Sequence, residues 1–293
     1  MRALTPMAGM CLFVLAVGCV SYPSGLAPFE LVRPWNNGKF TSPRFDSHFA
    51  YDASKRTGYF VRSSPQFQGW RILASRCAGG IWHEPYSPSF AGDGAEADPF
   101  ITQDGKHLYF ISTRADDGRK QRGLDIWKTS RTRTGDWSQP ERLPDPVNSA
   151  GMEWFPRVTQ DGWLYFGSDR PGGMGGTDIY RARSDNTGTW KIEHLGAGIN
   201  GPGDEYEAEI DRRGSLMVLM ADGDLFVSRF DRGRWGSRQR LGPEINTAAL
   251  EVGPLLSPSG KSLMFSRDTG PPASGEFLVA GPAEGWPPAC PPG

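Results

Sequence analysis

The stretch that decides the fold is EWFPRVTQDGWLYFGSDRPGGMGGTDIYRAR, from Glu153 to Arg183. It opens with an acid and a short apolar run, and Asp161-Gly162 is then typical of a tight turn. Leu164-Tyr165-Phe166 predicts an aromatic strand. A glycine-rich loop leads from there to Asp178-Ile179-Tyr180, which predicts a third strand. The stretch therefore predicts short strands joined by turns.

Nearly the same pattern occurs earlier, as EADPFITQDGKHLYFISTR and then LDIWKTSR, between Glu96 and Arg131. Other markers recur in the same order along the whole chain. The turn glycine lies at Gly105, Gly162, Gly214 and Gly260. A tryptophan shortly after a glycine lies at Trp82, Trp137, Trp190, Trp235 and, more loosely, Trp286. An asparagine lies at Asn148, Asn200 and Asn246.

These markers divide the chain into five repeats, near residues 43–95, 96–152, 153–204, 205–250 and 251–293. Each repeat holds about four short strands, which is typical of a propeller blade. The last repeat lacks an outer strand, but LVRPWNN at Leu31–Asn37 resembles LGPEINT at Leu241–Thr247. We therefore expect an all-β, five-bladed β-propeller of four-stranded blades over residues 29–293. The N-terminal strand would close the last blade and cover open strand edges.

Composition agrees with this prediction and limits the partners. The 293 residues include 38 glycines and 25 prolines, 12% of the residues are aromatic, and the formal net charge is -1. A charge so close to zero gives no electrostatic basis for binding nucleic acid or an anionic membrane surface. We therefore expect no nucleic-acid partner, and membrane contact only through an anchor.

The N-terminus predicts export. Residues 1–18 have Arg2 and an apolar run, Met7–Val17, as in a signal peptide, and the run is too short to span a membrane. The run ends in LAVGC, which resembles the lipobox of bacterial lipoproteins and would make Cys19 the lipidated residue. Ordinary secretory cleavage is the alternative. Val20 after the cysteine favours the outer membrane, so we expect an anchor and tether over residues 19–28 and a location on the periplasmic side of the envelope.

Two cysteines remain after Cys11 of the signal peptide and Cys19 are set aside. Cys77 and Cys290 lie in repeats that become neighbours when the ring closes. An oxidising compartment favours their pairing. They are the candidate disulfide.

DPFITQDGKHLYFISTR with DIW, and FPRVTQDGWLYFGSDRPGGMGGTDIYRAR, resemble the TolB-type, WD-like β-propeller repeats of bacterial envelope proteins. The resemblance covers roughly Pro43 to Trp286 and is strong in the second and third repeats. The fourth repeat departs from it, because Arg213 precedes Gly214 and the glycine-rich loop is missing. The resemblance implies a propeller fold and a non-enzymatic role in binding an envelope protein or a peptidoglycan-associated partner.

Each repeat carries an acid at one equivalent position. These acids are Asp46, Glu96, Glu153, Glu205 and Glu251. One interpretation is a ring of carboxylates near the innermost strands that binds a cation or a basic partner segment. The other is that each acid pairs with an arginine of the repeats, such as Arg114, Arg170 or Arg267, or caps a turn. The second is favoured because repeated residues usually serve the repeat itself.

Acids outside this register are better candidates for function. Asp98, Asp204, Glu207 and Glu209 break the symmetry and would lie near the channel mouth. An alternative function is therefore a carbohydrate-active propeller hydrolase that uses Asp98, Glu207 and Glu209. It requires two non-equivalent carboxylates about 5–10 Å apart in an open pocket.

Other site classes find no support in the sequence. GGMGG at Gly172–Gly176 joins two predicted strands and opens no helix, so it lacks the helix-terminal amides of a phosphate loop. The histidines share no metal-ligand spacing. They are His48, His83, His107 and His194. If the propeller has a non-enzymatic binding role, we expect no cofactor, no metal and no catalytic residue.

Overall fold

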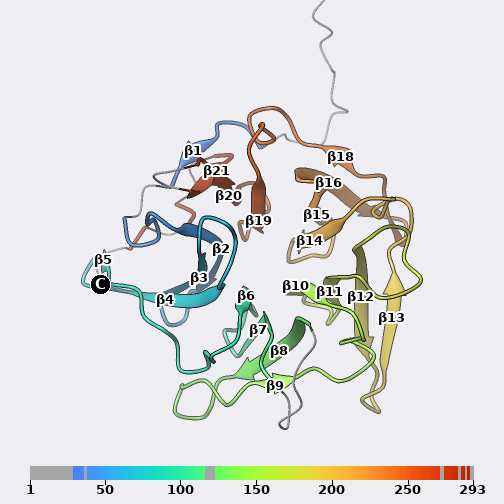
Figure 1. Ribbon diagram of the computed structural model, residues 1–293, viewed down its shortest axis with the longest axis horizontal. Coiled ribbons are helices and arrows are strands. Elements are labelled where there is room, and N and C mark those ends of the chain that lie inside the picture. The colour runs from blue at the N-terminus through green and yellow to red at the C-terminus, as the bar shows by residue number, and fades with distance from the viewer. Residues whose placement is uncertain are drawn as a thin grey trace, which may run out of the picture.

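The computed structural model describes residues 29–35, 38–115, 123–270, 274–282, 285–287 and 289–290. Five antiparallel sheets stand around a central axis, and the chain passes through them in sequence order (Figure 1). The predicted all-β, five-bladed propeller is confirmed. The signal peptide, the tether and Cys19 lie outside the described residues. None of the elements in the described ranges is a helix long and apolar enough to cross a membrane.

Each blade runs from an inner strand at the axis to an outer strand at the rim. Blade one holds β2 (Phe45–Asp52), β3 (Thr57–Ser63), β4 (Arg71–Ala78) and β5 (Ile81–Trp82). Blade two holds β6 (Glu96–Ile101), β7 (His107–Ser112), β8 (Asp125–Ser130) and β9 (Glu141–Arg142). Blade three holds β10 (Glu153–Val158), β11 (Leu164–Ser168), β12 (Asp178–Ser184) and β13 (Trp190–His194).

Blade four has a divided outer strand, and blade five is completed from the N-terminus. Blade four holds β14 (Glu205–Ile210), β15 (Leu216–Ala221), β16 (Asp224–Asp231), β17 (Arg234–Trp235) and β18 (Gln239–Arg240). Blade five holds β19 (Glu251–Leu256), β20 (Leu263–Asp268), β21 (Gly275–Ala280) and β1 (Arg33–Pro34).

The N-terminal strand closes the ring as predicted. β1 pairs antiparallel with β21, with Arg33 opposite Val279. The amide of Trp35 donates to the carbonyl of Phe277 at 2.8 Å, and Nη1 of Arg33 donates to the carbonyl of Gly281 at 2.6 Å. The edge of β21 is thereby covered by another strand of the same chain, which removes a template for edge-to-edge association.

The core lies between the blades, and the second strand of every blade contributes to it. Side chains on one face of a strand repeat with a period of two, so one residue in two can point between neighbouring sheets. The equivalent residues of the five second strands are all fully buried. They are Phe60, Phe110, Phe166, Leu219 and Phe265.

The recurring asparagine has a structural role that the sequence pattern did not reveal. Oδ1 of Asn148 accepts the amide of Ile126 at 2.7 Å, and Nδ2 donates to the carbonyls of Ile126 at 3.0 Å and Leu143 at 2.8 Å. Asn200 and Asn246 bind the third strands of their own blades in the same way. Each asparagine therefore satisfies backbone groups between the third strand and the outer segment.

A disulfide joins Cys77 to Cys290, with the two Cα atoms 5.4 Å apart. Cys77 lies in β4 of blade one, and Cys290 follows blade five. The bond spans 213 residues of sequence and links the two blades at which the ring closes. A crosslink across so long a loop restricts the unfolded chain more than the folded one.

We expect the double variant Cys77→Ala/Cys290→Ala to fold but to lose about 2–5 kcal/mol of unfolding free energy, because its unfolded chain is less restricted. Denaturant titration of both proteins measures this difference. Reduction of the wild type should lower its stability by a similar amount and leave the double variant unchanged. Equal midpoints for the wild type with and without reductant would contradict the expectation.

Candidate functional site

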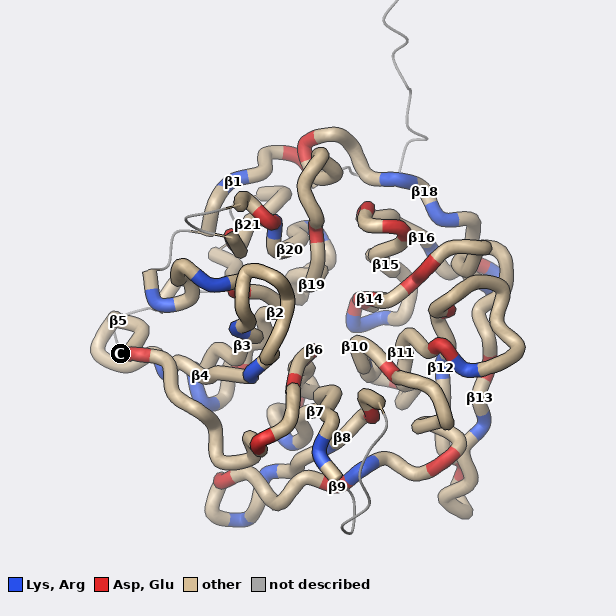
Figure 2. The backbone as a smooth tube through the Cα atoms, viewed as in Figure 1, with Lys and Arg blue, Asp and Glu red and all other residues tan. Residues whose placement is uncertain are grey.

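The five equivalent acids open the inner strands and are paired with arginines. Their side chains are all 0% exposed. The contacts are Asp46 with Arg62 at 2.6 Å, Glu153 with Arg170 at 3.1 Å, Glu251 with Arg267 at 2.8 Å, Glu96 with Arg114, and Glu205 with Arg238. Figure 2 shows basic and acidic positions interspersed around the ring. The structure therefore agrees with the pairing interpretation, and these five carboxylates do not form an open ring.

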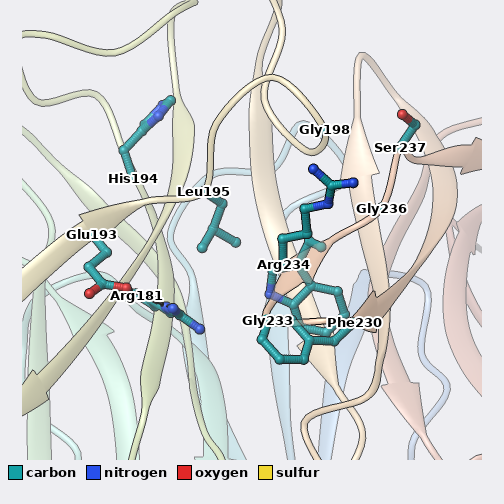
Figure 3. Close-up of a pocket in the computed structure, with 11 residues that line it drawn as sticks. Arg181, Glu193, His194, Leu195, Gly198, Phe230, Gly233, Arg234, Gly236 and Ser237 are labelled. Carbon is teal, nitrogen blue, oxygen red and sulfur yellow. Dashed lines mark hydrogen bonds and ion pairs between the residues drawn. The ribbon is translucent and has the colours of Figure 1, made fainter.

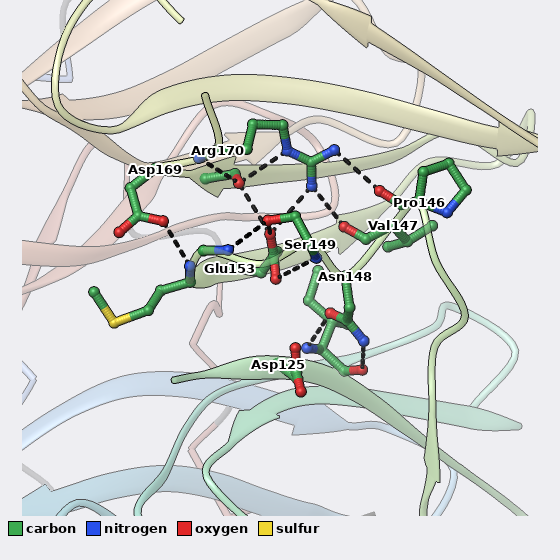
Figure 4. A network of polar contacts seen from close by, with 12 residues as sticks. Asp125, Pro146, Val147, Asn148, Ser149, Glu153, Asp169 and Arg170 are labelled. Atoms are coloured by element: carbon green, nitrogen blue, oxygen red, sulfur yellow. Dashed lines mark hydrogen bonds and ion pairs between the residues drawn. The ribbon is translucent and has the colours of Figure 1, made fainter. Parts of the chain in front are cut away.

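Figure 4 shows what one such pair does. Arg170 contacts Glu153 and also donates to the carbonyls of Pro146 at 3.0 Å and Val147 at 2.6 Å. The hydroxyl of Ser149 donates to Glu153 at 2.6 Å. Burial raises the pKa of Glu153, and the hydrogen bonds from Ser149 act against this rise. The pair therefore ties the start of an inner strand to the loop that precedes it.

Two residues further along, every inner strand has an irregularity in its register. In blade four the residue left unpaired is Tyr206, and Glu207 after it pairs with Met220. The residues two beyond each acid are His48, Asp98, Phe155, Glu207 and Gly253. Four of them have a positive φ, between 49° and 66°. Prolines follow three of them, at Pro99, Pro156 and Pro254, which is typical of a bulge because the ladder needs no N–H there.

A β-bulge redirects the side chains beside it. Here it brings residues of blades one, two and four together at the axis. Nε2 of His48 lies 2.8 Å from Oε1 of Glu207 and 3.3 Å from Oδ1 of Asp98. The position in blade five must be glycine, because a Cβ on Gly253 would lie 2.9 Å from the backbone nitrogen of His48.

The remaining oxygens of the two carboxylates accept backbone amides. Oδ2 of Asp98 accepts from Phe155 at 2.9 Å, and Oε2 of Glu207 accepts from Gly253 at 2.6 Å. Nδ1 of His48 contacts the hydroxyl of Ser47 at 2.7 Å. Asp98 and Glu207 are only 4% and 6% exposed. The carboxylates are therefore held in place before any ligand arrives.

An ion pair lies beside this group. Nε of Arg157 donates to Oε2 of Glu209 at 2.6 Å, and Oε1 of Glu209 accepts the amide of Leu256 at 3.1 Å. The guanidinium lies 3.5 Å from the ring centroid of Phe155, which favours a cation there. We call His48, Asp98, Glu207, Arg157 and Glu209 the central cluster.

Burial and neighbouring charges shift the pKa values in the central cluster. Burial acts to lower the pKa of His48, but the charges of Glu207 and Asp98 outweigh it and raise that pKa above 6.5. Burial raises the pKa of Asp98 above its ordinary value, although His48 acts to lower it. Burial also raises the pKa of Glu209, against the charge of Arg157.

A pocket of about 360 Å³ opens above the central cluster, and we call it the channel-mouth pocket. His48, Asp98 and Glu207 contribute its polar groups. Its aromatic lining residues are Phe67, Trp70, Trp154 and Tyr206. The ring centroid of Trp154 lies 6.0 Å from that of Trp70 and 5.7 Å from that of Tyr206. The aromatic rings therefore form a nearly continuous wall.

The five repeat acids, together with Asp98 and Glu207, are the seven acids that the sequence predicts as binding residues at the channel mouth, and the structure separates them into two groups. Asp98 and Glu207 line the pocket, whereas Asp46, Glu96, Glu153, Glu205 and Glu251 are buried in the arginine pairs. Glu209 lies beside Arg157, and Asp204 accepts the amide of Thr177 at 2.9 Å. Sequence reasoning missed His48, Trp154 and Tyr206. The signal that could have found the two aromatics is their place directly after a repeat acid, in EWF and EYE.

A larger hollow of about 600 Å³ lies between blades three and four, away from the axis (Figure 3). Arg181 and Glu193 face it and pair with each other at 2.7 Å, and His194 pairs with Asp178 at 3.3 Å. The charges of Arg181 and Glu193 are thus engaged with each other, and Arg234 also lines the hollow. No group of three or more potential ligands suited to a metal ion occurs in the described part of the chain.

No protein-family model matches this sequence, and no curated protein matches it. Among solved structures, a TolB homologue from Agrobacterium tumefaciens is 18% identical over 77% of this chain and 71% of that one, with a TM-score of 0.48. An α-L-arabinofuranosidase from Lactobacillus brevis is 14% identical over 83% and 91%, with a TM-score of 0.52. A periplasmic gluconolactonase from Pseudomonas aeruginosa is 12% identical over 75% and 64%, with a TM-score of 0.45. At these identities the likeness concerns the propeller fold alone, and the TolB-type resemblance of the repeats has no support from sequence families.

We expect Glu153→Gln to lower the unfolding free energy by about 3–5 kcal/mol, because it removes a fully buried carboxylate and leaves the mostly buried guanidinium of Arg170 without its charged partner. Glu193→Gln is the matched control. Its pair with Arg181 is partly exposed, so its loss should stay below about 1 kcal/mol. Denaturant titration compares the two variants, and similar losses would contradict a structural role for the buried acids.

His48 should make stability depend on pH. The pKa of His48 in the folded protein is raised above 6.5 by Glu207 and Asp98. The contribution of protonated His48 to the unfolding free energy is therefore fully present below pH 6.5 and is lost as the pH rises through the folded-state pKa. The melting temperature of His48→Gln should therefore lie further below that of the wild type at about pH 6 than at about pH 9. His83→Gln, with an exposed side chain, is the control and should give the same small difference at both pH values. A constant difference for His48→Gln would disprove the linkage.

Proposed function

We propose that this chain is a non-enzymatic binding propeller of the bacterial envelope, which holds an envelope protein or a peptidoglycan-associated partner at the channel-mouth pocket. The observation that carries the proposal is a preformed pocket of about 360 Å³ with aromatic walls and a fixed polar floor. Pockets of this kind bind a small group through apolar contact and orient it with few polar atoms. A rigid ring keeps the loss of conformational freedom on binding small.

The contacts of the acids support binding over hydrolysis. A glycosidase needs one carboxylic acid and one carboxylate that face the substrate from separate environments. Here Asp98 and Glu207 contact the same nitrogen of His48, at 3.3 and 2.8 Å, and so share one environment. Their other oxygens accept backbone amides. Neither has an oxygen without a protein partner to deliver or take a proton.

The carbohydrate-active hydrolase is the second candidate. It is favoured by one observation, which is that two non-equivalent carboxylates, Asp98 with a raised pKa and Glu207, share an aromatic pocket. On this alternative, the wild type cleaves aryl glycosides and both Asp98→Asn and Glu207→Gln abolish the cleavage. Absence of cleavage by the wild type across a panel of pentosides and hexosides would remove this candidate.

The envelope location rests on two features. LAVGC at the end of the apolar run would place a lipid on Cys19. The disulfide between Cys77 and Cys290 is of the kind that persists in oxidising compartments such as the periplasm. Lipid attachment would hold the ring near a membrane through residues 19–28 and leave the propeller free to meet its partner.

A crosslinking pull-down from the envelope fraction tests anchoring and partnership together. We expect the wild type to be membrane-bound and to capture one envelope component reproducibly, whereas Cys19→Ala should be soluble. Wild type that is soluble and captures nothing would overturn both the anchor and the binding role.

Trp154→Ala tests whether capture uses the channel-mouth pocket. We expect it to reduce capture at least tenfold, because it removes the ring that contacts both Trp70 and Tyr206. Trp190→Ala is the matched control, because Trp190 is a partly exposed tryptophan on β13 of the same blade. Equal capture by the two variants, both verified as folded by circular dichroism, would place the partner elsewhere on the ring.

A further inference from the structure

The charges of the central cluster do not balance. Each repeat acid has one arginine partner, so those five pairs are neutral. The central cluster has three carboxylates, from Asp98, Glu207 and Glu209, against Arg157 and His48. Burial raises the pKa of Asp98 and of Glu209, so the count applies where all three carboxylates are ionised. One negative charge then remains with His48 protonated, and two remain with His48 neutral. The floor of the channel-mouth pocket is therefore anionic.

No other described residue that lines the pocket carries a positive charge to compensate this one. Among the described residues that line it, none is a lysine or an arginine. Asp98 and Glu207 are almost completely buried, and an uncompensated charge in such a place is costly. A ligand that brings a positive charge would supply the missing partner.

The walls suit the same ligand. The rings of Trp70, Trp154 and Tyr206 line the pocket, and aromatic faces attract cations. Met220, Leu250 and other apolar side chains complete the lining and can contact a methylene stem. A volume of about 360 Å³ lies at the low end of small-ligand pockets, so it suits a single side chain.

The arrangement of acceptors distinguishes between cations. A guanidinium binds best to a carboxylate that offers both oxygens side by side. In Asp98 and in Glu207, one oxygen faces His48 and the other accepts a backbone amide. A compact ammonium group needs no such fork and can share the free lone pairs of several oxygens.

We propose that the channel-mouth pocket recognises the side chain of a lysine on the partner protein, with the ammonium group above Asp98 and Glu207 and the aliphatic stem against Trp154 and Tyr206. This rests on the proposed function and names the chemistry that the pocket selects. The partner is thus expected to present an exposed lysine on a protruding loop or chain end.

Nuclear magnetic resonance titration of the full chain carrying Cys19→Ala tests this, with the tryptophan indole signals as the readout. The probes are Nα-acetyl-lysine amide and Nα-acetyl-norleucine amide, which differ in the charged group. We expect the lysine probe to bind at least tenfold more tightly than the norleucine probe. Glu207→Gln should remove most of that ratio, because it deletes one negative charge and keeps an acceptor for the amide of Gly253.

Asp185→Asn is the matched control, since it deletes one carboxylate charge on the β12–β13 hairpin and should leave the ratio unchanged. Asp98→Asn serves if Glu207→Gln proves unfolded. Equal binding of both probes, or a ratio that survives both pocket variants, overturns the lysine proposal. Tighter binding of glucosamine than of the lysine probe would also overturn it and assign the site to an amino sugar.

The proposed function can fail separately. Partner capture that Trp154→Ala abolishes, together with no preference for the lysine probe, leaves the binding site in place and removes only its charge selectivity. Capture that Trp154→Ala leaves intact removes the binding site itself.

Discussion

The buried carboxylate–arginine pair at the start of each inner strand is the interaction on which the rest of the ring depends. A carboxylate buried this deeply must have a partner of opposite charge. In the pair of Glu153 and Arg170, the guanidinium also donates to two carbonyls of the preceding loop. The pair therefore fixes where one blade ends and the next begins. All five inner strands have such a pair at or next to their first residue.

Because the five pairs occupy equivalent positions, the bulges that follow them also lie at nearly equivalent positions in the inner strands. The five residues that lie two positions beyond the acids differ in kind, and four of them have a positive φ. His48, Asp98 and Glu207 meet, Phe155 packs beside them, and Gly253 leaves room for the backbone of His48. The acid–arginine pairs thus recur in every blade, whereas the residues that meet at the axis differ from blade to blade. This separation lets one position vary without disturbing the joints between the blades.

The ring is closed by other interactions than these ion pairs. β1 adds the strand that blade five lacks, and the bond between Cys77 and Cys290 joins the last residues to blade one. Trp35 packs against Phe40, Phe49 and Phe277, so the closing segment also buries aromatic surface. Strand pairing, apolar burial and a covalent bond act at the same seam. The seam is where a ring of repeats would otherwise open.

Repetition in the sequence was sufficient to determine the propeller, its five blades and its N-terminal closing strand, because each repeat must place the same residues in the same environment. It also indicated that the repeat acids pair with arginines, although Arg238 replaces the expected partner in blade four, where β15 ends in the tight turn at Asp222-Gly223. Only the tertiary structure brought His48 of blade one to Asp98 and Glu207 of blades two and four. These residues occur once each, and their meeting depends on bulges and on ring closure. Prolines follow three of the bulges, but a single sequence does not show that these three side chains contact one another.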